Sequence, residues 1–340
     1  MAKPKCAVEA GAESIRAGLS EECIRLAFLD NHFYVKGRFL EVASPDDKYK
    51  TMAYTVRDRM LHRWVSTIRT YQQVNPRTVC YLSAEYLPGP FLGNNLLNLG
   101  IEEPTRKALA GLGIDLDELI EHEEEPGLGN GGLGRFAACF MDSLATLQIS
   151  AISYGIRYEF GIFTQAIRDG KQVETTDNRL RYGNPWEVRR PNVAYEVTLG
   201  GHTEQYLDEQ DRFRVRWVPG GTFHGVAIDT PILDHGVSTG NLLRLWSAEA
   251  AEDFDFHAFN RDDYYGAVTR RGQHDPYLLC ADYAGYIACQ DQASAAYRDT
   301  ANWTRMSILN VARMGKFSSD RTIAEYCRDI WRVTPTPVEL

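Results

Sequence analysis

A glycine-rich segment is the part of this sequence whose residue types and spacing could do chemistry. It reads Gly-Leu-Gly-Asn-Gly-Gly-Leu-Gly over residues 127–134, and an apolar run with the composition of a helix follows at 136–148. Glycines let backbone N–H groups converge, and the first turn of the following helix points its positive end at the same place. Such an arrangement can hold a phosphate group. From these residues alone, a structural glycine turn and an anion cradle are about equally favoured.

The same segment contains the spacing GxGxxG twice, which raises the possibility of a dinucleotide site. That spacing indicates a dinucleotide only when a strand precedes it and a βαβ unit frames it. The preceding residues, EHEEEP at 121–126, do not have the composition of a strand. A dinucleotide site is therefore not predicted.

The other candidate residues, which are carboxylates, histidines and aromatic residues, are expected to have structural rather than catalytic roles. Glu85 stands near the end of a β-rich segment, 77–86, and taken alone it resembles an ordinary glutamate at a strand end. Adjacent carboxylates at 46–47, 123–125 and 262–263 are expected to be solvated, so no glycosidase pair is predicted. The eight histidines form neither HxxxH nor HxH pairs, so no metal site is expected. A further group of aromatic and charged residues is expected to pack and to form an ion pair; it comprises Tyr86, Tyr154, Arg157, Tyr158, Glu159 and Phe160.

The elements that would position these groups alternate between helical and extended patterns. Helices are predicted over 12–35, 44–71, 91–98, 102–112, 115–122, 136–148, 276–298, 302–314 and 319–331. The second of these begins with Ser44 as N-cap, Pro45 in the first turn and two aspartates. Segment 149–171 alternates like paired strands with a turn at 168–171, and several short strands follow over 192–232. Residues 241–268 are expected to begin extended and to turn helical. The pattern predicts an α/β or α+β protein with a helical tail.

Composition narrows the function classes. The 340 residues carry a formal net charge of −9, with a pI near 5.5, which disfavours a nucleic acid or an anionic membrane as partner. No apolar run approaches the length of a membrane span, and the first residues lack the apolar core of a secretory signal. The seven cysteines show no CxxC spacing, so reduced thiols and a cytoplasmic location are expected.

Longer strings carry a more specific signal. Residues 126–148, PGLGNGGLGRFAACFMDSLATLQ, and 154–163, YGIRYEFGIF, resemble the amino-terminal half of glycogen (α-glucan) phosphorylases. Residues 302–331, NWTRMSILNVARMGKFSSDRTIAEYCRDIW, resemble the last stretch of the same family. The two parts join near 268–275, VTRRGQHD, where the rest of the family's sequence is absent.

The resemblance implies a glycosyltransferase-B-like, phosphorylase-type amino-terminal domain with a β-rich insertion, closed by carboxy-terminal helices. The expected divisions are a flexible segment at 1–20, the domain at 21–268, a linker at 269–275, and helices at 276–335 that pack back on the domain.

The resemblance also assigns roles to residues of the glycine segment. Gly131, Gly132 and Leu133 would contact phosphate and the glucosyl group, Arg135 would cap the local structure, and Glu85 would line the same cleft. The family uses pyridoxal phosphate on a lysine within a motif similar to EASGTxNMK, and no such string occurs in this sequence. Covalent cofactor binding and a complete catalytic set are therefore not expected.

Three functional hypotheses follow. The first is an internally deleted phosphorylase that has no turnover alone, the family reaction being phosphorolysis of α-1,4-glucan to glucose 1-phosphate, and that needs a second polypeptide. The second is a non-catalytic module that binds glucan, phosphate or a phosphorylase subunit, with a homodimer as a further possible state. The third is a mis-joined chain that does not fold stably.

Overall fold

The computed structural model describes residues 14–177, 179–250 and 279–340. The chain divides into two compact units: Met1–Ala251 together with Thr322–Leu340, and Glu252–Arg321. The helices of the first unit are α1 (Glu21–Asp30), α2 (Pro45–Val74), α3 (Phe91–Leu99), α4 (Glu102–Ala110), α5 (Leu116–Glu121) and α6 (Gly132–Thr146), with helical turns η1 (Asn31–Val35) and η2 (Leu40–Val42).

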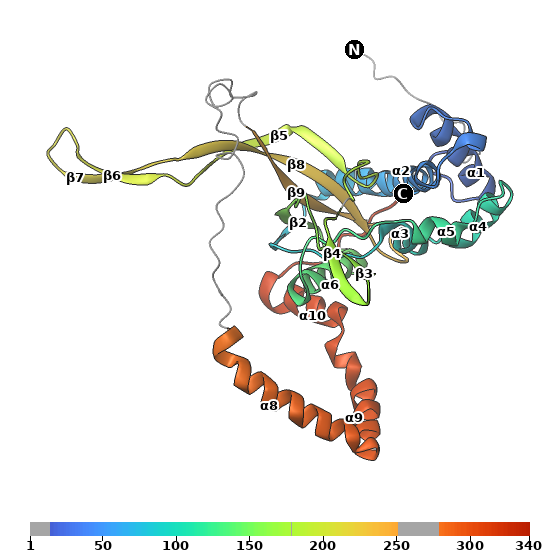
Figure 1. Ribbon diagram of the computed structural model, residues 1–340. Helices are drawn as coiled ribbons and strands as arrows, with labels where there is room; N and C mark the ends of the chain where they lie inside the picture. Colours follow the sequence, from blue (N-terminus) through green and yellow to red (C-terminus); the bar gives the residue numbers. More distant parts are fainter. Residues whose placement is uncertain (1–13, 178, 251–278) are drawn as a thin grey trace, which may run out of the picture. The chain divides into compact units, whose positions relative to one another are not determined.

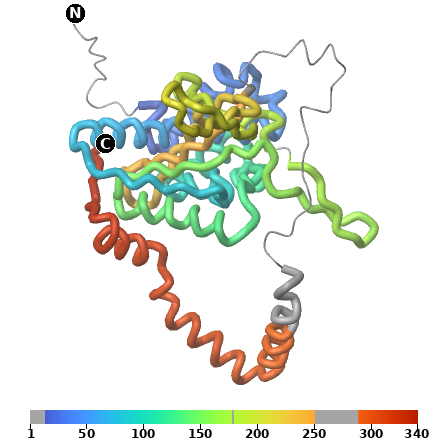
Figure 2. The backbone as a smooth tube through the Cα atoms, turned by 90° about the vertical axis from the view of Figure 1, so that its left-hand side faces the viewer, coloured from blue at the N-terminus to red at the C-terminus, as the bar shows by residue number. Residues whose placement is uncertain are grey.

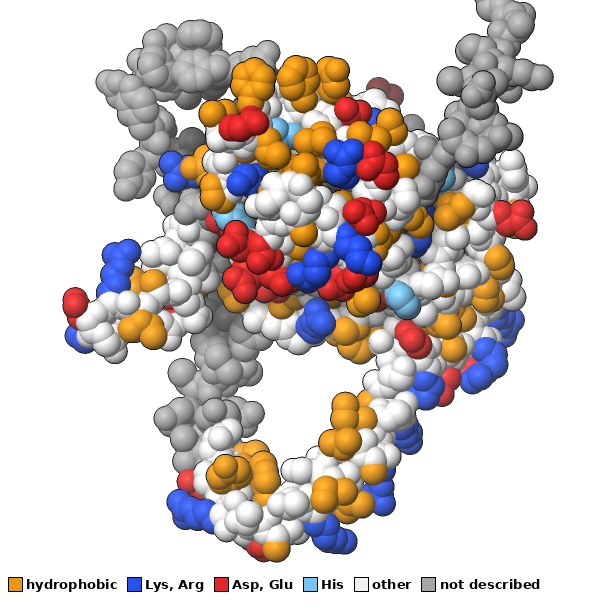
Figure 3. All heavy atoms as spheres, turned by 90° about the vertical axis from the view of Figure 1, so that its right-hand side faces the viewer, with side chains coloured by type: hydrophobic (Ala, Val, Ile, Leu, Met, Phe, Trp, Pro, Cys, Tyr) orange, Lys and Arg blue, Asp and Glu red, His pale blue; other side chains and the backbone are white. Residues whose placement is uncertain are grey.

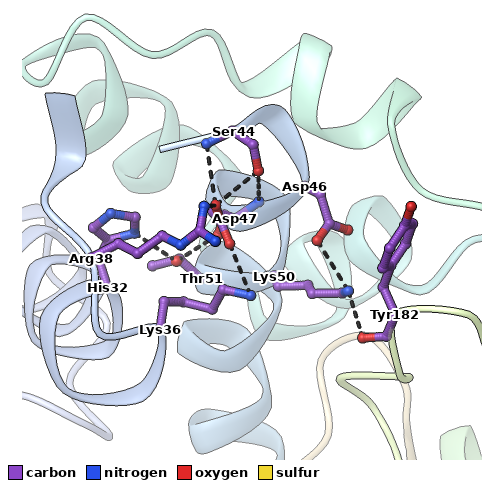
Figure 4. Close-up of polar contacts among 9 residues, drawn as sticks. All are labelled: His32, Lys36, Arg38, Ser44, Asp46, Asp47, Lys50, Thr51 and Tyr182. Carbon is purple, nitrogen blue, oxygen red and sulfur yellow. Dashed lines mark hydrogen bonds and ion pairs between the residues drawn. The ribbon is translucent and has the colours of Figure 1, made fainter. Parts of the chain in front are cut away.

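The longest helix, α2, begins where the local sequence predicts it. The Ser44 hydroxyl accepts a hydrogen bond from the Asp47 amide, and the Asp47 carboxylate accepts one from the Ser44 amide, which completes a capping box (Figure 4). Pro45 occupies the first turn, and Asn75 ends the helix in a left-handed conformation. The helix predicted over 12–35 is shorter in the structure, because α1 starts only after the Ser20 cap and ends in the irregular turn η1.

A five-stranded mixed sheet forms the centre of the first unit. Its strands lie in the order β1 (Val79–Leu82), β2 (Ala151–Ile156), β9 (Gly240–Ala250), β8 (Gly221–Leu233) and β5 (Val188–Leu199). β1, β2 and β9 are parallel, whereas β8 pairs antiparallel with β9 and β5. Helix α2 contacts β8 and β9 on one face of this sheet, and α6 contacts β2, β8 and β9 on the other (Figures 1 and 2).

Two hairpins stand outside the central sheet. β3 (Thr164–Arg168) and β4 (Lys171–Thr175) form one, with the turn at 168–171 that the sequence predicts. β6 (His202–Leu207) and β7 (Phe213–Val218) form the other, between β5 and β8 in the chain. The strand at the start of 149–171 does not pair with its neighbour in sequence, because β2 lies between β1 and β9 instead. Of the segment 241–268, residues to 250 are extended and the rest lies outside the described residues.

The end of the chain packs on the same unit as its beginning. Helix α10 (Ser319–Tyr326) and the turn η4 (Cys327–Trp331) bring Ile323 and Cys327 against Phe140 and Leu144 of α6, in a buried cluster. The Thr336 amide then donates a hydrogen bond to the Gln148 carbonyl, at 2.8 Å. The carboxy-terminal residues from 322 onward are thus part of the first unit.

The second unit is helical where it is described. It contains α8 (Leu279–Arg298), α9 (Thr300–Arg313) and the turn η3 (Met314–Phe317). α8 and α9 contact each other, and the rings of Tyr297 and Trp303 meet edge to face at 5.3 Å. None of the side chains of α9 is buried.

The charge distribution on one face, and the length and apolarity of the described helices, relate to two classes of partner, nucleic acids and membranes. On the face of the first unit drawn in Figure 3, Lys and Arg side chains are interspersed with Asp and Glu side chains. This pattern is typical of a solvated surface rather than of a nucleic-acid interface. Among the described residues, we find no helix with the length and apolarity that crossing a membrane requires.

Candidate functional site

The glycine segment lies at the carboxyl ends of two parallel strands. The Tyr86 amide, just after β1, donates to the Leu128 carbonyl at 3.0 Å, and the Leu87 amide donates to the Gly134 carbonyl at 3.0 Å. The Ile162 amide, after β2, donates to the Gly127 carbonyl at 2.8 Å. These bonds fix both ends of the segment at the edge of the sheet where ligands of α/β proteins usually bind.

Packing explains three of the glycines. A Cβ atom at Gly127 would collide with Ile162, one at Gly129 would lie 2.7 Å from the Glu85 Cβ, and one at Gly134 would lie 3.0 Å from the Leu87 side chain. These positions must be glycine for the segment to approach its neighbours so closely.

Gly131 and Gly132 have a different environment. A Cβ atom at either position would meet nothing within 4 Å, and Gly131 has an extended backbone with φ of 172°. Neither packing nor a left-handed conformation therefore requires glycine here. The space in front of these two residues is open, so that their backbone is accessible to a ligand.

Helix α6 begins at this open point. Gly131 is its N-cap, and no side chain caps the helix. The first amides of the helix have no acceptor one turn earlier, and the helix dipole is positive at this end. Leu133, the second residue of the helix, is 59% exposed. The geometry is suited to an anion of the size of phosphate.

Two charged side chains flank the cradle. One Glu85 carboxylate oxygen accepts a hydrogen bond from the Asn130 amide at 3.1 Å, which places the carboxylate against the loop. The Arg135 guanidinium donates to the Leu87 carbonyl at 3.3 Å. The structure thus brings Glu85, Gly131, Gly132 and Leu133 into one region, with a carboxylate that can accept hydroxyl groups beside amides that can bind an anion.

Tyrosines hold the Glu85 segment in position. Tyr86 is 1% exposed, and its hydroxyl donates to the Tyr154 carbonyl at 3.0 Å. Burial raises the pKa of the Tyr86 hydroxyl, which keeps it a neutral donor. The Tyr158 hydroxyl donates to the Ala84 carbonyl at 2.9 Å. The ion pair expected in this aromatic group joins Arg157 to Glu187 at 2.8 Å, a partner thirty residues away that the sequence reasoning missed.

The expectation that the adjacent carboxylates are solvated is wrong for two of them. Asp47 is 5% exposed. Glu123 accepts hydrogen bonds from the Leu92 amide at 2.7 Å, the Trp186 indole at 2.8 Å and the Tyr49 hydroxyl at 3.1 Å. Burial raises the pKa of Glu123. Asp47 is held by nearby partners, Ser44, Lys36 and Arg38, whereas the donors to Glu123 are distant in sequence. Residues 262–263 lie outside the described residues.

Metal ligands do not gather in the described ranges: no group of three or more His, Cys, Asp or Glu side chains there is placed to hold an ion. The charged side chains that contact the glycine loop are Glu85 and Arg135. Backbone amides, the Glu85 carboxylate and the Arg135 guanidinium are the polar groups that the site presents.

Comparison with known proteins decides the family. The sequence matches the family described as carbohydrate phosphorylase over residues 109–274 and again over 270–333. This chain belongs to the carbohydrate phosphorylase family. The resemblance predicted from the sequence is confirmed, as is the α/β, glycosyltransferase-B-like fold class of the phosphorylases. The two matched segments overlap at 270–274.

Glycogen phosphorylases are among the similar proteins. A glycogen phosphorylase of Synechocystis sp. (strain ATCC 27184 / PCC 6803 / Kazusa) is 61% identical over 256 residues, which are 75% of this chain and 30% of the relative. The brain form of Homo sapiens is 43% identical over 275 residues, 80% of this chain and 32% of the relative. The liver form of Homo sapiens is 46% identical over 241 residues, which are 71% of this chain and 28% of the relative. The chain spans about a third of the length of these phosphorylases.

The phosphorylase cofactor can be tested against the lysines that the structure describes. Phosphorylases use pyridoxal phosphate, which needs a lysine amine free to form a Schiff base. The Lys50 amine lies 3.1 Å from Asp46 and donates to the Tyr182 carbonyl at 2.7 Å, and the Lys36 amine lies 3.0 Å from Asp47. These amines are engaged by carboxylates. Neither of these two amines is therefore free to form a Schiff base with the cofactor.

Proposed function

We propose that this chain is a phosphorylase-family module that binds phosphate and the end of an α-glucan at its glycine loop, and that it has no phosphorolytic turnover alone. The observation that carries the proposal is the open space over Gly131 and Gly132 at the uncapped start of α6. The Glu85 carboxylate beside the loop would accept a sugar hydroxyl. Phosphate would be bound by the amides of Gly132 and Leu133.

The lack of turnover follows from what the chain does not contain. Phosphorolysis needs two phosphates positioned against a sugar, since proximity and electrostatic stabilisation supply most of the rate. The sequence has no EASGTxNMK-like motif, and the described lysines at Lys36 and Lys50 are ion-paired. Pyridoxal phosphate is accordingly proposed not to bind covalently.

The test is calorimetric titration with inorganic phosphate. The variant Gly132→Asp places a carboxylate at the first position of α6, where an acidic residue favours the helix while it repels an anion. We expect phosphate binding by the unaltered chain and at least tenfold weaker binding by the variant, with an unchanged melting temperature. Gly221→Asp is the matched control, because Gly221 also faces open space but lies at the start of β8. Equal binding by both variants would refute the phosphate site.

A second candidate function is that of one subunit in a larger assembly. Exposed apolar side chains occur in the glycine segment, at the start of α6 and in the two segments that bond to the loop: Leu82 is 75% exposed, Leu133 59%, Phe136 51% and Phe160 60%. Exposed apolar side chains in one region favour contact with another polypeptide, here a phosphorylase subunit or a second copy of this chain. Co-elution with a full-length phosphorylase, and glucose 1-phosphate release by the mixture, would support this function. A monomer that never co-elutes would exclude it.

The proposal includes a cytoplasmic location. Cys23, Cys80, Cys139, Cys289 and Cys327 are free thiols in the structure, which suits a reducing compartment.

A further inference from the structure

A second pocket lies in the first unit, apart from the open face of the glycine loop. It has a volume of about 200 Å³. Its walls come from the start of α2, the first residue of α3, the segment 122–126 and the loop 179–186. This volume is below the usual range of pockets for drug-sized ligands, so a molecule of about one sugar ring is the size that it suits.

Four of the charged groups that line the pocket, Asp46, Lys50, Glu123 and Arg179, have partners within the protein. The Lys50 amine is bonded to Asp46 and to the Tyr182 carbonyl, as Figure 4 shows. Glu123 accepts its three bonds from the protein, and Arg179 lies 3.0 Å from Asp177. A ligand therefore meets hydrogen-bonding groups and the exposed carboxylate of Glu124.

The balance of charge argues against an anionic ligand. Three carboxylates line the pocket, those of Asp46, Glu123 and Glu124, against two cations, Lys50 and Arg179. A phosphate or sugar phosphate would face a net negative wall, which like-charge repulsion disfavours. A neutral ligand has no such cost.

Aromatic rings supply the apolar part of the walls. Phe91 and Trp186 stack with centroids 5.9 Å apart, and both are largely buried. Tyr182 is 68% exposed, with the Lys50 amine 5.2 Å from its ring centroid. Of these three rings, that of Tyr182 is exposed to a ligand. An exposed aromatic face that packs on C–H groups, next to donors and carboxylates that pair with hydroxyls, is the chemistry that recognises a pyranose ring. An ammonium group has three donors and Lys50 uses two of them, so one remains for a hydroxyl.

We propose that this pocket binds a neutral hexose, as a saccharide site separate from the glycine loop. The site does not rest on phosphate binding at the loop. Pro126 forms part of its wall and directly precedes Gly127, so an occupied pocket borders the segment that carries the loop.

Saturation-transfer NMR with D-glucose and the full chain tests the site. We expect transfer from the protein to glucose, and roughly five- to tenfold weaker binding in Tyr182→Ala, which removes an exposed ring and leaves the backbone carbonyl that Lys50 uses. Tyr195→Ala is the matched control, since Tyr195 is 63% exposed but lies on β5, outside the pocket. It should bind glucose as the unaltered chain does.

Competition experiments with phosphate and spermidine distinguish glucose binding in this pocket from binding at the glycine loop and from selection of a cation. Glucose binding should persist in Gly132→Asp and in the presence of inorganic phosphate, even if phosphate never binds at the loop. If phosphate displaced glucose, glucose would be bound at the glycine loop, and the proposal would be overturned. Displacement by spermidine would show that the acidic wall selects a cation instead. The proposal would also be overturned if no saturation transfer to glucose were seen, or if Tyr182→Ala and Tyr195→Ala weakened glucose binding equally.

Discussion

Replacing Asp47 by asparagine should destabilise the fold in a pH-dependent way. Asp47 is 5% exposed and sits between the Ser44 cap and two cations; its oxygens lie 2.9 Å from Arg38 and 3.0 Å from Lys36 (Figure 4). Burial by itself would raise the pKa of this carboxyl, but the hydrogen bonds from Ser44 and the charge of Lys36 outweigh it and lower the pKa from 3.8 to about 2. The ionised form is therefore the one that the folded state favours.

The magnitude follows from that shift. One pKa unit corresponds to about 1.4 kcal/mol, so ionised Asp47 should contribute roughly 2.5 kcal/mol to the free energy of unfolding at neutral pH. Because the folded-state pKa is the lower one, the contribution is present above about pH 4, the unfolded value, and is lost as the pH falls towards 2. Asp47→Asn should cost about this amount at pH 7 and progressively less in acid.

Urea unfolding of the unaltered chain and of Asp47→Asn, followed by tryptophan fluorescence between pH 7 and the lowest pH at which the fold persists, measures this cost. Glu41→Gln is the control, because Glu41 is an exposed acid in the nearby turn η2 and its neutralisation should change stability by less than about 0.5 kcal/mol. A cost below about 1 kcal/mol at pH 7, or one that does not shrink in acid, would refute the reasoning.

Three further outcomes are expected. Glu123→Ala should lower the free energy of unfolding by about 3 kcal/mol, because three donors lose their acceptor, whereas exposed Glu124→Ala should change it little; urea unfolding compares them. Ile323→Ala should cost about 3 kcal/mol and expose the carboxy-terminal segment to hydrogen exchange, whereas Ile330→Ala, at a site 64% exposed, should do neither. Purified chain incubated with pyridoxal phosphate, maltooligosaccharide and phosphate should release no glucose 1-phosphate; release would contradict the proposed lack of turnover.

Local chemistry made several elements predictable. Ser44, Pro45 and the aspartates after them define the start of α2, and the turn at 168–171 defines the β3–β4 hairpin. The glycine segment is followed by a helix, as its composition indicates. In each case the decisive contacts lie within a few residues of one another, so the sequence displays them side by side.

Contacts between distant residues were not predictable in this way. The acceptor role of Glu123 depends on Leu92, Trp186 and Tyr49, which are 31, 63 and 74 residues away. The position of β2 between β1 and β9 depends in the same manner on strands far along the chain. The glycine loop was found through its family string, whereas the separation of packed glycines from open ones needed the coordinates of Ile162, Glu85 and Leu87.

The return of the chain to its starting unit has a thermodynamic consequence. Residues up to 251 and from 322 onward belong to one unit. Glu252–Arg321 is therefore an inserted segment, an excursion of about 70 residues whose two ends join that unit. The entropy of closing such an excursion grows only with the logarithm of its length, at about 0.6 kcal/mol for each doubling. An excursion about eight times longer would thus cost the unit only roughly 2 kcal/mol more. A core closed by the Ile323 cluster can therefore gain several hundred residues at this one point and still fold around the same contacts.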